Sequence, residues 1–233
     1  MKYLVALLLG LAVGVAAFLM LLYFNPLTTN NRLSALSVSD NQVITFNYST
    51  VAMDALVYTN DGESQVAPYP AKVLQLWEPT VRRTDALVTV LRDGRNLPAA
   101  IGIKFSSDSE KTNVLNGEAI VDSVWHVYAP GKGSLFVEQQ ENYWAFLRDI
   151  AIPARWSSGK NWRGTWNASI TSGPGALGTS RVFGGSGIFA GLEMDAVESL
   201  SAKAYSVEHG PVAIDAELAI EIPRRDAALS QDP

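Results

Sequence analysis

A histidine, a tyrosine and a glutamate occupy positions from which they could exchange protons. In the segment SVWHVYA (123–129), His126 and Tyr128 are two residues apart and share one face of a β-strand. Glu138 lies on the next segment, SLFVEQQ (134–140). Neighbours across a hairpin lie about 5 Å apart, which is close enough for an acid–base group. The alternative is that this face is solvated outer surface, since the sequence does not fix the register.

One aromatic and three basic residues are further candidates for contact with a ligand. Phe136 lies on the same face of its segment as the glutamate, where an apolar side chain could line a binding site. The segment PARWSSGKNWRGTW (153–166) interleaves Arg155, Lys160 and Arg163 with three tryptophans. Such a mixture can hold a lipid headgroup, a glycan or another anionic ligand. The alternative is a loop that exposes its cations between buried tryptophans.

The composition argues against several other kinds of site. The chain has 233 residues and a net charge of −5, so its overall field does not attract nucleic acid. It has no cysteine, which excludes disulfides, zinc–thiolate centres and thiol nucleophiles. Its two histidines are His126 and His209, too few for a histidine-rich metal site. We therefore expect no metal, no cofactor and no nucleic-acid partner.

A glycine-rich stretch, RVFGGSGIFAGLEM (181–194), is the most conspicuous motif in the chain. As a dinucleotide-binding loop it would need GxGxxG, but its glycines are spaced GxGxxxG. As a nucleophile elbow centred on Ser186 it would need GxSxG, but Ile188 replaces the last glycine. It also lacks the lysine of a Walker loop. The glycines are better explained as a tight corner between strands, where the backbone bends sharply.

The same stretch resembles a segment of the allene oxide cyclase and dirigent-type barrels. In that family a strand ends in GGSG or GGTG, followed by an apolar pair with Phe, a short residue and Gly, which correspond here to residues 184–191. The resemblance extends over residues 160–222. It implies an eight-stranded antiparallel barrel whose lumen binds or transforms a hydrophobic small molecule. It transfers no catalytic residue to this chain and makes Ser186 a determinant of the fold.

Alternating apolar and polar residues predict the strands that would carry these sites. The clearest case is AIDAELAIEI (213–222), in which every second residue is apolar. Further strands are expected at 42–49, 54–59, 71–77, 84–91, 99–105, 123–129, 134–140, 162–171 and 200–208. The sequences DGRN (93–96) and PGKG (130–133) are typical of turns inside hairpins. Short strands in this number predict an all-β fold, a calycin-like antiparallel barrel of about eight strands.

Two segments outside the N-terminal region compete as helices. ENYWAFLRDI (141–150) has apolar residues on one helical stripe and is expected to end before Pro153. LEMDAVESLSAKAY (192–205) has apolar residues whose spacing fits either a helix or a strand.

An uninterrupted apolar segment opens the chain. Residues 3–24 carry no charge and, as a helix, would span a hydrocarbon core of about 30 Å. Because apolar residues continue past the small pair at 16–17, we expect an uncleaved signal-anchor rather than a cleaved signal. The expected divisions of the chain are the anchor at 1–25, a polar linker at 26–40, the barrel at 41–222 and a polar tail at 223–233.

Charges and small residues indicate how this segment is placed. Lys2 precedes it and Arg32 is the first charge after it, so the positive-inside rule favours a cytoplasmic N-terminus. The barrel is then expected on the extracytoplasmic or periplasmic side of the inner or plasma membrane. Gly10 and Gly14 form a GxxxG spacing that can bring two membrane helices together, in a homo-oligomer or with another membrane protein. The alternative is that small residues are merely scattered through an apolar helix.

These patterns indicate a membrane-anchored extracytoplasmic barrel that binds a hydrophobic, lipid-like small molecule. Cyclisation or isomerisation is its candidate reaction. The alternative is a non-catalytic accessory or interaction subunit of a membrane complex. An open apolar cavity in the barrel would favour the first function, and a barrel filled by side chains would favour the second.

Overall fold

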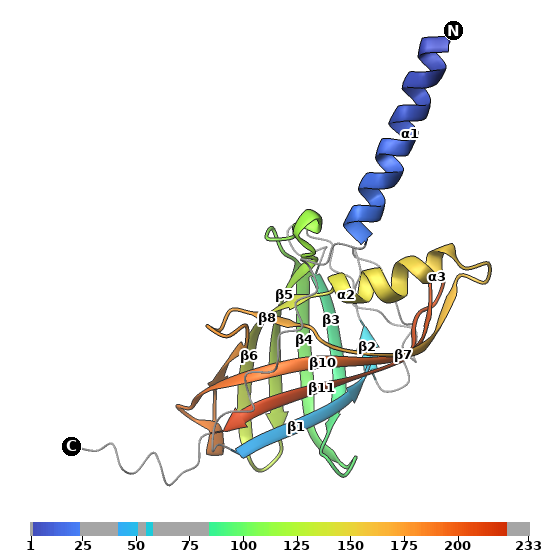
Figure 1. Ribbon diagram of the computed structural model, residues 1–233. Coiled ribbons are helices and arrows are strands. Elements are labelled where there is room, and N and C mark those ends of the chain that lie inside the picture. Colours follow the sequence, from blue (N-terminus) through green and yellow to red (C-terminus); the bar gives the residue numbers. More distant parts are fainter. Residues whose placement is uncertain (1, 24–41, 51–54, 58–83, 223–233) are drawn as a thin grey trace.

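The computed structural model describes residues 2–23, 42–50, 55–57 and 84–222. The N-terminal helix α1 (Lys2–Tyr23) projects from one end of a β-barrel (Figure 1). The length and apolar composition of α1 fit a membrane-spanning helix and equally a signal sequence. The predicted linker at 26–40, strand at 71–77 and tail at 223–233 lie outside the described residues.

Eight antiparallel strands close into a barrel, which confirms the predicted all-β, calycin-like fold (Figure 1). In order around the wall they are β1 (Gln42–Ser49), β11 (Gly210–Ile222), β10 (Glu193–Ser206), β9 (Ser180–Gly184), β6 (Gly133–Asn142), β5 (Ile120–Ala129), β4 (Pro98–Asp108) and β3 (Thr84–Arg92). The circle closes where β1 meets β3 through the residue pair Asn47 and Arg92. The predicted turn at 93–96 connects β3 to β4, and the predicted turn at 130–133 connects β5 to β6, so each closes a hairpin.

Three further strands extend this wall. β2 (Ala55–Val57) pairs with β3, and β8 (Thr171–Gly173) pairs with β6. β7 (Asn161–Ser169) pairs with the second half of β10, beyond the place where β9 ends. The sheet therefore continues past the barrel on the side of β7.

The segment 192–205, whose spacing fitted a helix or a strand, is a strand. Within β10 every second side chain from Met194 to Ala202 is buried. β11 pairs with one edge of β10, while β9 and β7 share the other edge. Hydrogen bonds along both edges and a period of two therefore outweigh the helical spacing of its apolar residues.

A continuous helical segment, residues 144–156, connects β6 to β7 and lies across one end of the barrel (Figure 1). It consists of α2 (Trp144–Phe146), the π-helical turn η4 (Leu147–Ala151) and α3 (Ile152–Trp156). It starts later than the helix predicted at 141–150, because residues 141 and 142 still pair in β6. It also continues through Pro153, because the first turn of α3 tolerates a residue without an N–H.

A second, smaller core fixes this helical segment to the barrel. Ile150 packs with Ala202 of β10 and Ile214 of β11, and all three are buried. The rings of Phe146 and Trp166 meet edge to face with their centroids 5.8 Å apart. The helical segment is therefore held by aromatic and aliphatic contacts to β7, β10 and β11.

The glycine-rich stretch forms a corner between β9 and β10 that includes the turn η5 (Gly187–Phe189). The amides of Gly185 and Ser186 donate to the carbonyl of Ser134 at 2.8 and 3.1 Å, so the corner packs on the β5–β6 hairpin. A Cβ at Gly184 would overlap the carbonyl oxygen of Phe189. Ser186 Oγ accepts a hydrogen bond from the Ser134 amide at 3.0 Å. The structure thus gives these residues the structural role predicted from their spacing.

Candidate functional site

Three charged side chains meet inside the barrel. Lys104 comes from β4, Glu141 from β6 and Glu198 from β10. The Lys104 Nζ lies 2.7 Å from Glu141 Oε1 and 2.8 Å from Glu198 Oε1. The exposed fraction of Lys104 is 4%, and both glutamates are fully buried at 0%. We call Lys104, Glu141 and Glu198 the interior ion cluster.

Strand alternation and one glycine place the ammonium among these groups. Lys104 has the same inward orientation as Ala100 and Gly102, which precede it on β4. A Cβ at Gly102 would lie 2.7 Å from the indole of Trp125, so the glycine makes room for that ring. The Lys104 Nζ lies 5.3 Å from the centroid of the same ring, within range of a cation–π attraction.

Neutral donors complete the environment of Glu198. Trp125 Nε1 donates to Glu198 Oε2 at 3.0 Å, and the Tyr48 hydroxyl donates to Oε1. The Gln139 side-chain amide also donates to Oε2. Ser180 Oγ donates to Gln139 Oε1 at 2.9 Å, which fixes the orientation of the amide. Both carboxylate oxygens of Glu198 are therefore satisfied.

Glu141 has a similar set of partners. Gln139 Nε2 donates to Glu141 Oε1 at 2.6 Å, so this amide bridges the two buried carboxylates. The Ser123 hydroxyl donates to the same oxygen. The Tyr143 hydroxyl donates to Oε2 at 2.6 Å. The interior ion cluster thus belongs to a connected polar network within an otherwise apolar core.

Burial and ion pairing shift the pKa values of Lys104 and Glu198 in opposite directions. Burial alone would lower the pKa of Lys104, but the adjacent Glu141 and Glu198 outweigh it and raise the pKa above its ordinary value of 10.5. Burial alone would raise the pKa of Glu198. The ammonium of Lys104, with hydrogen bonds from Lys104 and Tyr48, instead holds it below its ordinary value of 4.5. Lys104 and Glu198 are therefore both charged at neutral pH.

The two tyrosines of the network keep their protons. Burial raises the pKa of both Tyr48 and Tyr143 well above the ordinary value of 10.0. The negative charges of Glu198 and Glu141 raise these pKa values further. Both hydroxyls are thus neutral hydrogen-bond donors at physiological pH.

The arrangement can hold and move protons but does not form a metal site. Formally, the cluster has one negative charge in excess, and each carboxylate is linked to a tyrosine hydroxyl. Within the part of the chain that the structure describes, no three histidine or carboxylate side chains are grouped as metal ligands. The chemistry that these residues offer is hydrogen-bond donation and proton transfer.

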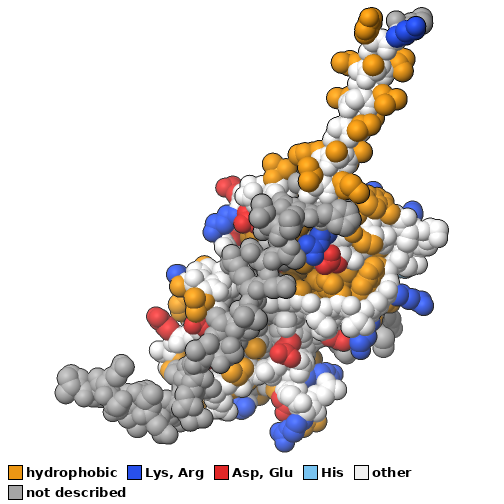
Figure 2. Space-filling model, in the orientation of Figure 1, with side chains coloured by type: hydrophobic (Ala, Val, Ile, Leu, Met, Phe, Trp, Pro, Cys, Tyr) orange, Lys and Arg blue, Asp and Glu red, His pale blue; other side chains and the backbone are white. Residues whose placement is uncertain are grey.

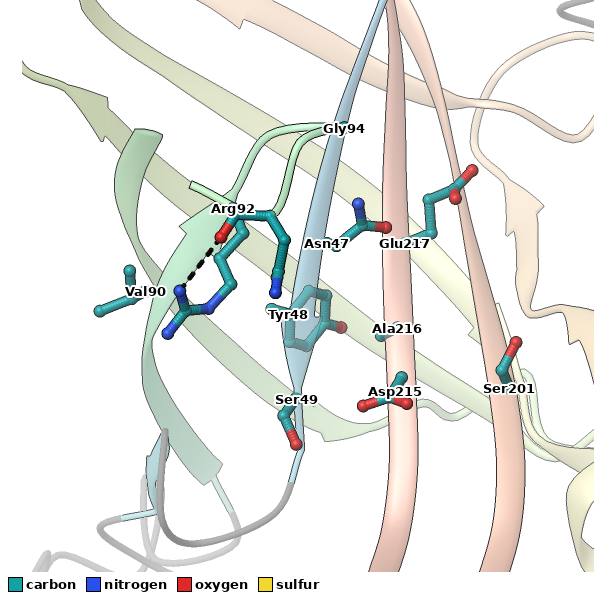
Figure 3. A pocket seen from close by; sticks show the side chains of 11 residues that line it. Asn47, Tyr48, Ser49, Val90, Arg92, Gly94, Ser201, Asp215, Ala216 and Glu217 are labelled. Atoms are coloured by element: carbon teal, nitrogen blue, oxygen red, sulfur yellow. Dashed lines mark hydrogen bonds between the residues drawn. The ribbon is translucent and has the colours of Figure 1, made fainter. Parts of the chain in front are cut away.

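A hollow of about 670 Å³ lies on the outer side of β1 and β11, beside the β3–β4 turn (Figure 3). Its described lining consists of Asn47, Tyr48, Ser49, Val90, Arg92, Gly94, Asn96, Ser201, Asp215, Ala216 and Glu217. Tyr48 and Ala216 are buried at 4% and 3% exposure and form its floor. Arg92 donates to the Asn96 carbonyl at 3.4 Å across one edge. We call this the first hollow; Tyr48 belongs both to it and to the polar network.

A second, smaller hollow of about 290 Å³ lies over β4, β5 and β6. It is lined by the exposed apolar side chains of Phe105 and Val124, together with Glu138. Ser123 and Gln139, which hydrogen-bond the interior ion cluster, also contribute to its lining. Glu138, one of the predicted catalytic residues, thus lies in this hollow.

The predicted acid–base group lies on the outer face of the barrel. On β5, Trp125 and Val127 are buried, so alternation turns His126 and Tyr128 outward. The bulky indole takes the interior side because Gly102 leaves room for it. The arrangement corresponds to the alternative of a solvated outer face, and these side chains do not line the lumen.

The four predicted residues of this hairpin occupy three neighbouring rows of that face. His126 stacks on Phe136 with ring centroids 4.7 Å apart. Tyr128 is 51% exposed and is paired with Ser134. Glu138 is paired with Val124, on the other side of the stacked rings. The catalytic roles of His126, Tyr128 and Glu138 and the ligand contact of Phe136 stay predictions for this outer surface.

The predicted basic residues lie around the end of the helical segment. Arg155 is exposed near the end of α3, Lys160 is exposed in the turn that follows, and Arg163 is exposed on β7. Lys160 has a positive φ of 49°. Trp162 and Trp166 are partly buried against the smaller core, as their shared face predicts, whereas Trp156 is 78% exposed. Binding of an anionic group by the three cations stays a prediction.

The interior ion cluster was not predicted, although the sequence contains a signal for it. Lys104 follows Ala100 and Gly102 on one face of its strand, and Glu198 lies between Ala196 and Leu200 on one face of β10. A charged residue at an apolar position of an alternating strand indicates a buried charge that needs a partner. Which charges meet depends on the barrel closure, which no local pattern contains.

Comparisons with known proteins add little to this geometry. No protein-family model and no curated protein matches the chain. A solved structure of the Diels–Alderase AbmU from Streptomyces koyangensis aligns with a TM-score of 0.38 at 9% identity, over 83% of this chain and 80% of that one. A nonspecific heme-binding cyclase that catalyses a [4 + 2] cycloaddition in neoabyssomicin biosynthesis gives the same TM-score and identity, over 83% and 73%. Likenesses this remote carry no argument about function.

Proposed function

We propose that this chain is a membrane-anchored barrel that binds a small amphipathic molecule and rearranges it by proton transfer, as an isomerase or cyclase. The interior ion cluster is the observation that supports this most. Burying two carboxylates and an ammonium adds little net stability, because desolvation offsets their attraction. Buried, paired ionisable groups concentrate at functional sites. Lys104, Glu141 and Glu198 are groups of this kind among the described residues of the barrel.

Tyr48 is the residue that we propose acts on the bound molecule. It forms part of the floor of the first hollow, and its hydroxyl is bonded to Glu198. Because its pKa is raised, this hydroxyl keeps its proton, which it donates to Glu198 Oε1. We propose that it turns this proton from Glu198 to the bound molecule, while Lys104 and Trp125 continue to hold the carboxylate. A positioned donor stabilises the negative charge that develops on a carbonyl oxygen during isomerisation or cyclisation. Such a rearrangement needs no oxidant or reductant.

The lining of the first hollow suggests what kind of molecule would bind. Arg92, Asp215 and Glu217 bring charges of both signs, while Val90 and Ala216 are apolar. A ligand with a polar group and an apolar body fits this lining better than a purely hydrophobic one. The resemblance to allene oxide cyclase and dirigent-type barrels favours the same class of reaction.

Helix α1 supports the membrane anchor in this proposal. Its side chains from Lys2 to Leu21 are exposed, and leucine, alanine and valine predominate among them. An exposed apolar helix of this length is stable when lipid surrounds it. With Lys2 on the cytoplasmic side, the barrel would lie outside the cytoplasm.

A second candidate is the non-catalytic accessory subunit, and the packing of the interior favours it. Trp125, Leu135 and Leu218 have at most 1% exposure and fill the centre of the barrel. A filled barrel serves as a rigid scaffold. In that case Gly10 and Gly14 of α1 would contact a membrane partner.

Small molecules that accompany the purified protein distinguish the two candidates. We would isolate the full chain in detergent, extract it with organic solvent and analyse the extract by mass spectrometry. Ser201→Trp would fill the first hollow from β10, and Lys203→Trp on the same strand but outside the lining is its control. Wild type and Lys203→Trp should release the same compound, and Ser201→Trp should release little of it. Absence of any enriched compound would favour the accessory subunit.

The chemical step is tested with the compound so recovered. Tyr48→Phe keeps the ring and removes the donor, so binding should persist while conversion slows by about 10²-fold or more. Tyr205→Phe, on β10 but outside the lining of the first hollow, is the control and should convert the compound at the wild-type rate. Equal rates for Tyr48→Phe and wild type would show that Tyr48 takes no part in the reaction.

A further inference from the structure

One end of the barrel combines the attachment of α1 with exposed apolar side chains. The C-terminal end of α1 lies beside the helical segment 144–156 (Figure 1). Tyr23, the last residue of α1, lies close enough to Arg148 of η4 to affect the pKa of its guanidinium. Figure 2 shows apolar side chains along α1 and again on the adjoining end of the barrel.

The helical segment presents different residues to the barrel and to its surroundings. Trp144, Ile150 and Ala154 are buried against the barrel. Trp156, at the end of α3, is 78% exposed, and Leu147 is 37% exposed. Apolar surface of an indole in water is unfavourable in free energy. This cost is removed only when lipid or another apolar surface covers the ring.

A second element at the same end presents apolar side chains in a fixed geometry. The short turn η3 (Val114–Asn116) lies between β4 and β5, where Val114 and Leu115 are 48% and 58% exposed. The Asn113 side chain accepts the Leu115 amide at 3.2 Å, which caps the turn. Gly117 closes it with a φ of 72°. Because strand direction alternates, the connections after β4 and after β6 leave the barrel at the same end.

We infer that this end of the barrel lies on the bilayer surface, with Leu115 of η3 and Trp156 of α3 inserted into the headgroup layer. The inference rests on the membrane anchor of the proposed function and specifies its geometry. Tryptophan is enriched at the membrane interface, and the adjacent Arg155 can extend its charge to lipid phosphates. A helix that buries one face in protein and exposes apolar residues on the other can lie in the interface plane. The occupant of this surface is therefore lipid.

The lack of cysteine in the chain allows a direct test. Single-cysteine variants of the full chain would carry an environment-sensitive fluorophore in nanodiscs of mixed phosphatidylcholine and phosphatidylglycerol. The test positions are Leu115→Cys and Trp156→Cys. Ile188→Cys, 49% exposed on the η5 turn, is the control for an exposed apolar site away from the proposed surface, and Val13→Cys reports on α1. Spin-labelled lipids then quench fluorophores that lie in the bilayer.

The four labels separate this inference from the anchor itself. We expect labels at 115 and 156 to lose most of their fluorescence to lipids spin-labelled near the headgroup, whereas the label at 188 keeps its fluorescence. The label at 13 should be quenched by lipids spin-labelled deep in the acyl chain. Quenching at 13 without quenching at 115 and 156 would overturn the inference that the barrel lies on the bilayer surface, and would still support the anchor. Quenching at 115 and 156 without quenching at 13 would support the surface and overturn the anchor. Absence of quenching at all three would overturn both.

Discussion

At the scale of single residues, the interior ion cluster decides how the barrel responds to mutation and pH. Lys104 is the cation between two buried carboxylates, and each carboxylate has further neutral donors. Coulomb attraction in this interior is strong because little water screens it. Removal of Lys104 therefore leaves two buried carboxylates without a partner of opposite charge.

Lys104→Met should destabilise the protein by about 3–5 kcal/mol, because it leaves two buried carboxylates without their cation. Methionine retains much of the volume of the lysine stem, so the loss reports on charge rather than on a cavity. Urea unfolding of the full chain in detergent at pH 7 measures the change. Lys203→Met, at an exposed position of β10, should unfold close to wild type. An unchanged midpoint for Lys104→Met would mean that the carboxylates are not charged.

The pKa shifts predict a loss of stability at both ends of the pH scale. The pKa of Glu198 is below 4.5 in the folded state, so its contribution is present above 4.5 and is lost as pH falls through the folded pKa. The pKa of Lys104 is raised, so its contribution is present below 10.5 and is lost as pH rises through the folded pKa. Tyr48, with its raised pKa, adds to the alkaline loss. Unfolding free energies from acid to alkaline pH measure both limbs.

Glu198→Gln supplies the control for the acid limb. Glutamine does not titrate, so the variant should lose less stability than wild type between neutral and acid pH, although it is less stable at pH 7. The same acid dependence in both proteins would assign that limb to other carboxylates.

At the scale of elements, contacts between turns hold the ends of the strands in register. The corner after β9 packs on the β5–β6 hairpin through backbone hydrogen bonds, including the Ile188 amide to the Lys132 carbonyl at 2.7 Å. Such contacts need backbones to approach more closely than side chains allow. The glycines of the corner are therefore important for stability although none contacts the interior ion cluster.

Gly184→Ala should destabilise the protein strongly, because its Cβ would overlap the Phe189 carbonyl and the corner must shift. We expect a loss of about 2 kcal/mol or more, as for other forced changes in a packed region. Gly94→Ala, in the β3–β4 turn, has nothing within 4 Å of the added Cβ and is the matched control. Thermal unfolding of the two variants beside wild type tests the difference. Equal melting temperatures would show that the corner can relax.

At the scale of the whole molecule, the N-terminal helix decides where the barrel acts. If α1 is an uncleaved anchor, the full chain should remain in membranes after extraction with alkaline carbonate. Intact-mass measurement should then find α1 still attached. Release of the barrel, together with a mass that lacks the first residues, would identify α1 as a cleaved signal. Gly10→Leu tests helix–helix contact separately from anchoring. The variant should show weaker association of α1 with another membrane helix, while the protein stays in the membrane fraction.

The sequence predicted the barrel well and the site poorly, for a physical reason. Alternation and turn chemistry are local, so strands such as 84–91 and 134–140 and their hairpins follow from short segments. Which face of a hairpin is interior is not local. Phe105, Val124 and Tyr128 are apolar or aromatic on the outer face, so hydrophobicity alone does not distinguish the two sides of β4 and β5. The contact of Lys104 with Glu141 and Glu198 depends on closure of the barrel, which brings β4, β6 and β10 around one interior.

The pairing of β1 with β11 has a consequence for the order of folding. It joins Gln42 to Ile222, so the first and last strands of the barrel meet across most of the chain. Contacts so distant in sequence form slowly, because a long loop must close first. The hairpins β3–β4 and β5–β6 can form during translation. The barrel cannot close until β11 has been synthesised, because β1 pairs with it. Until β10 is in place, Lys104 lacks Glu198, one of its two carboxylate partners.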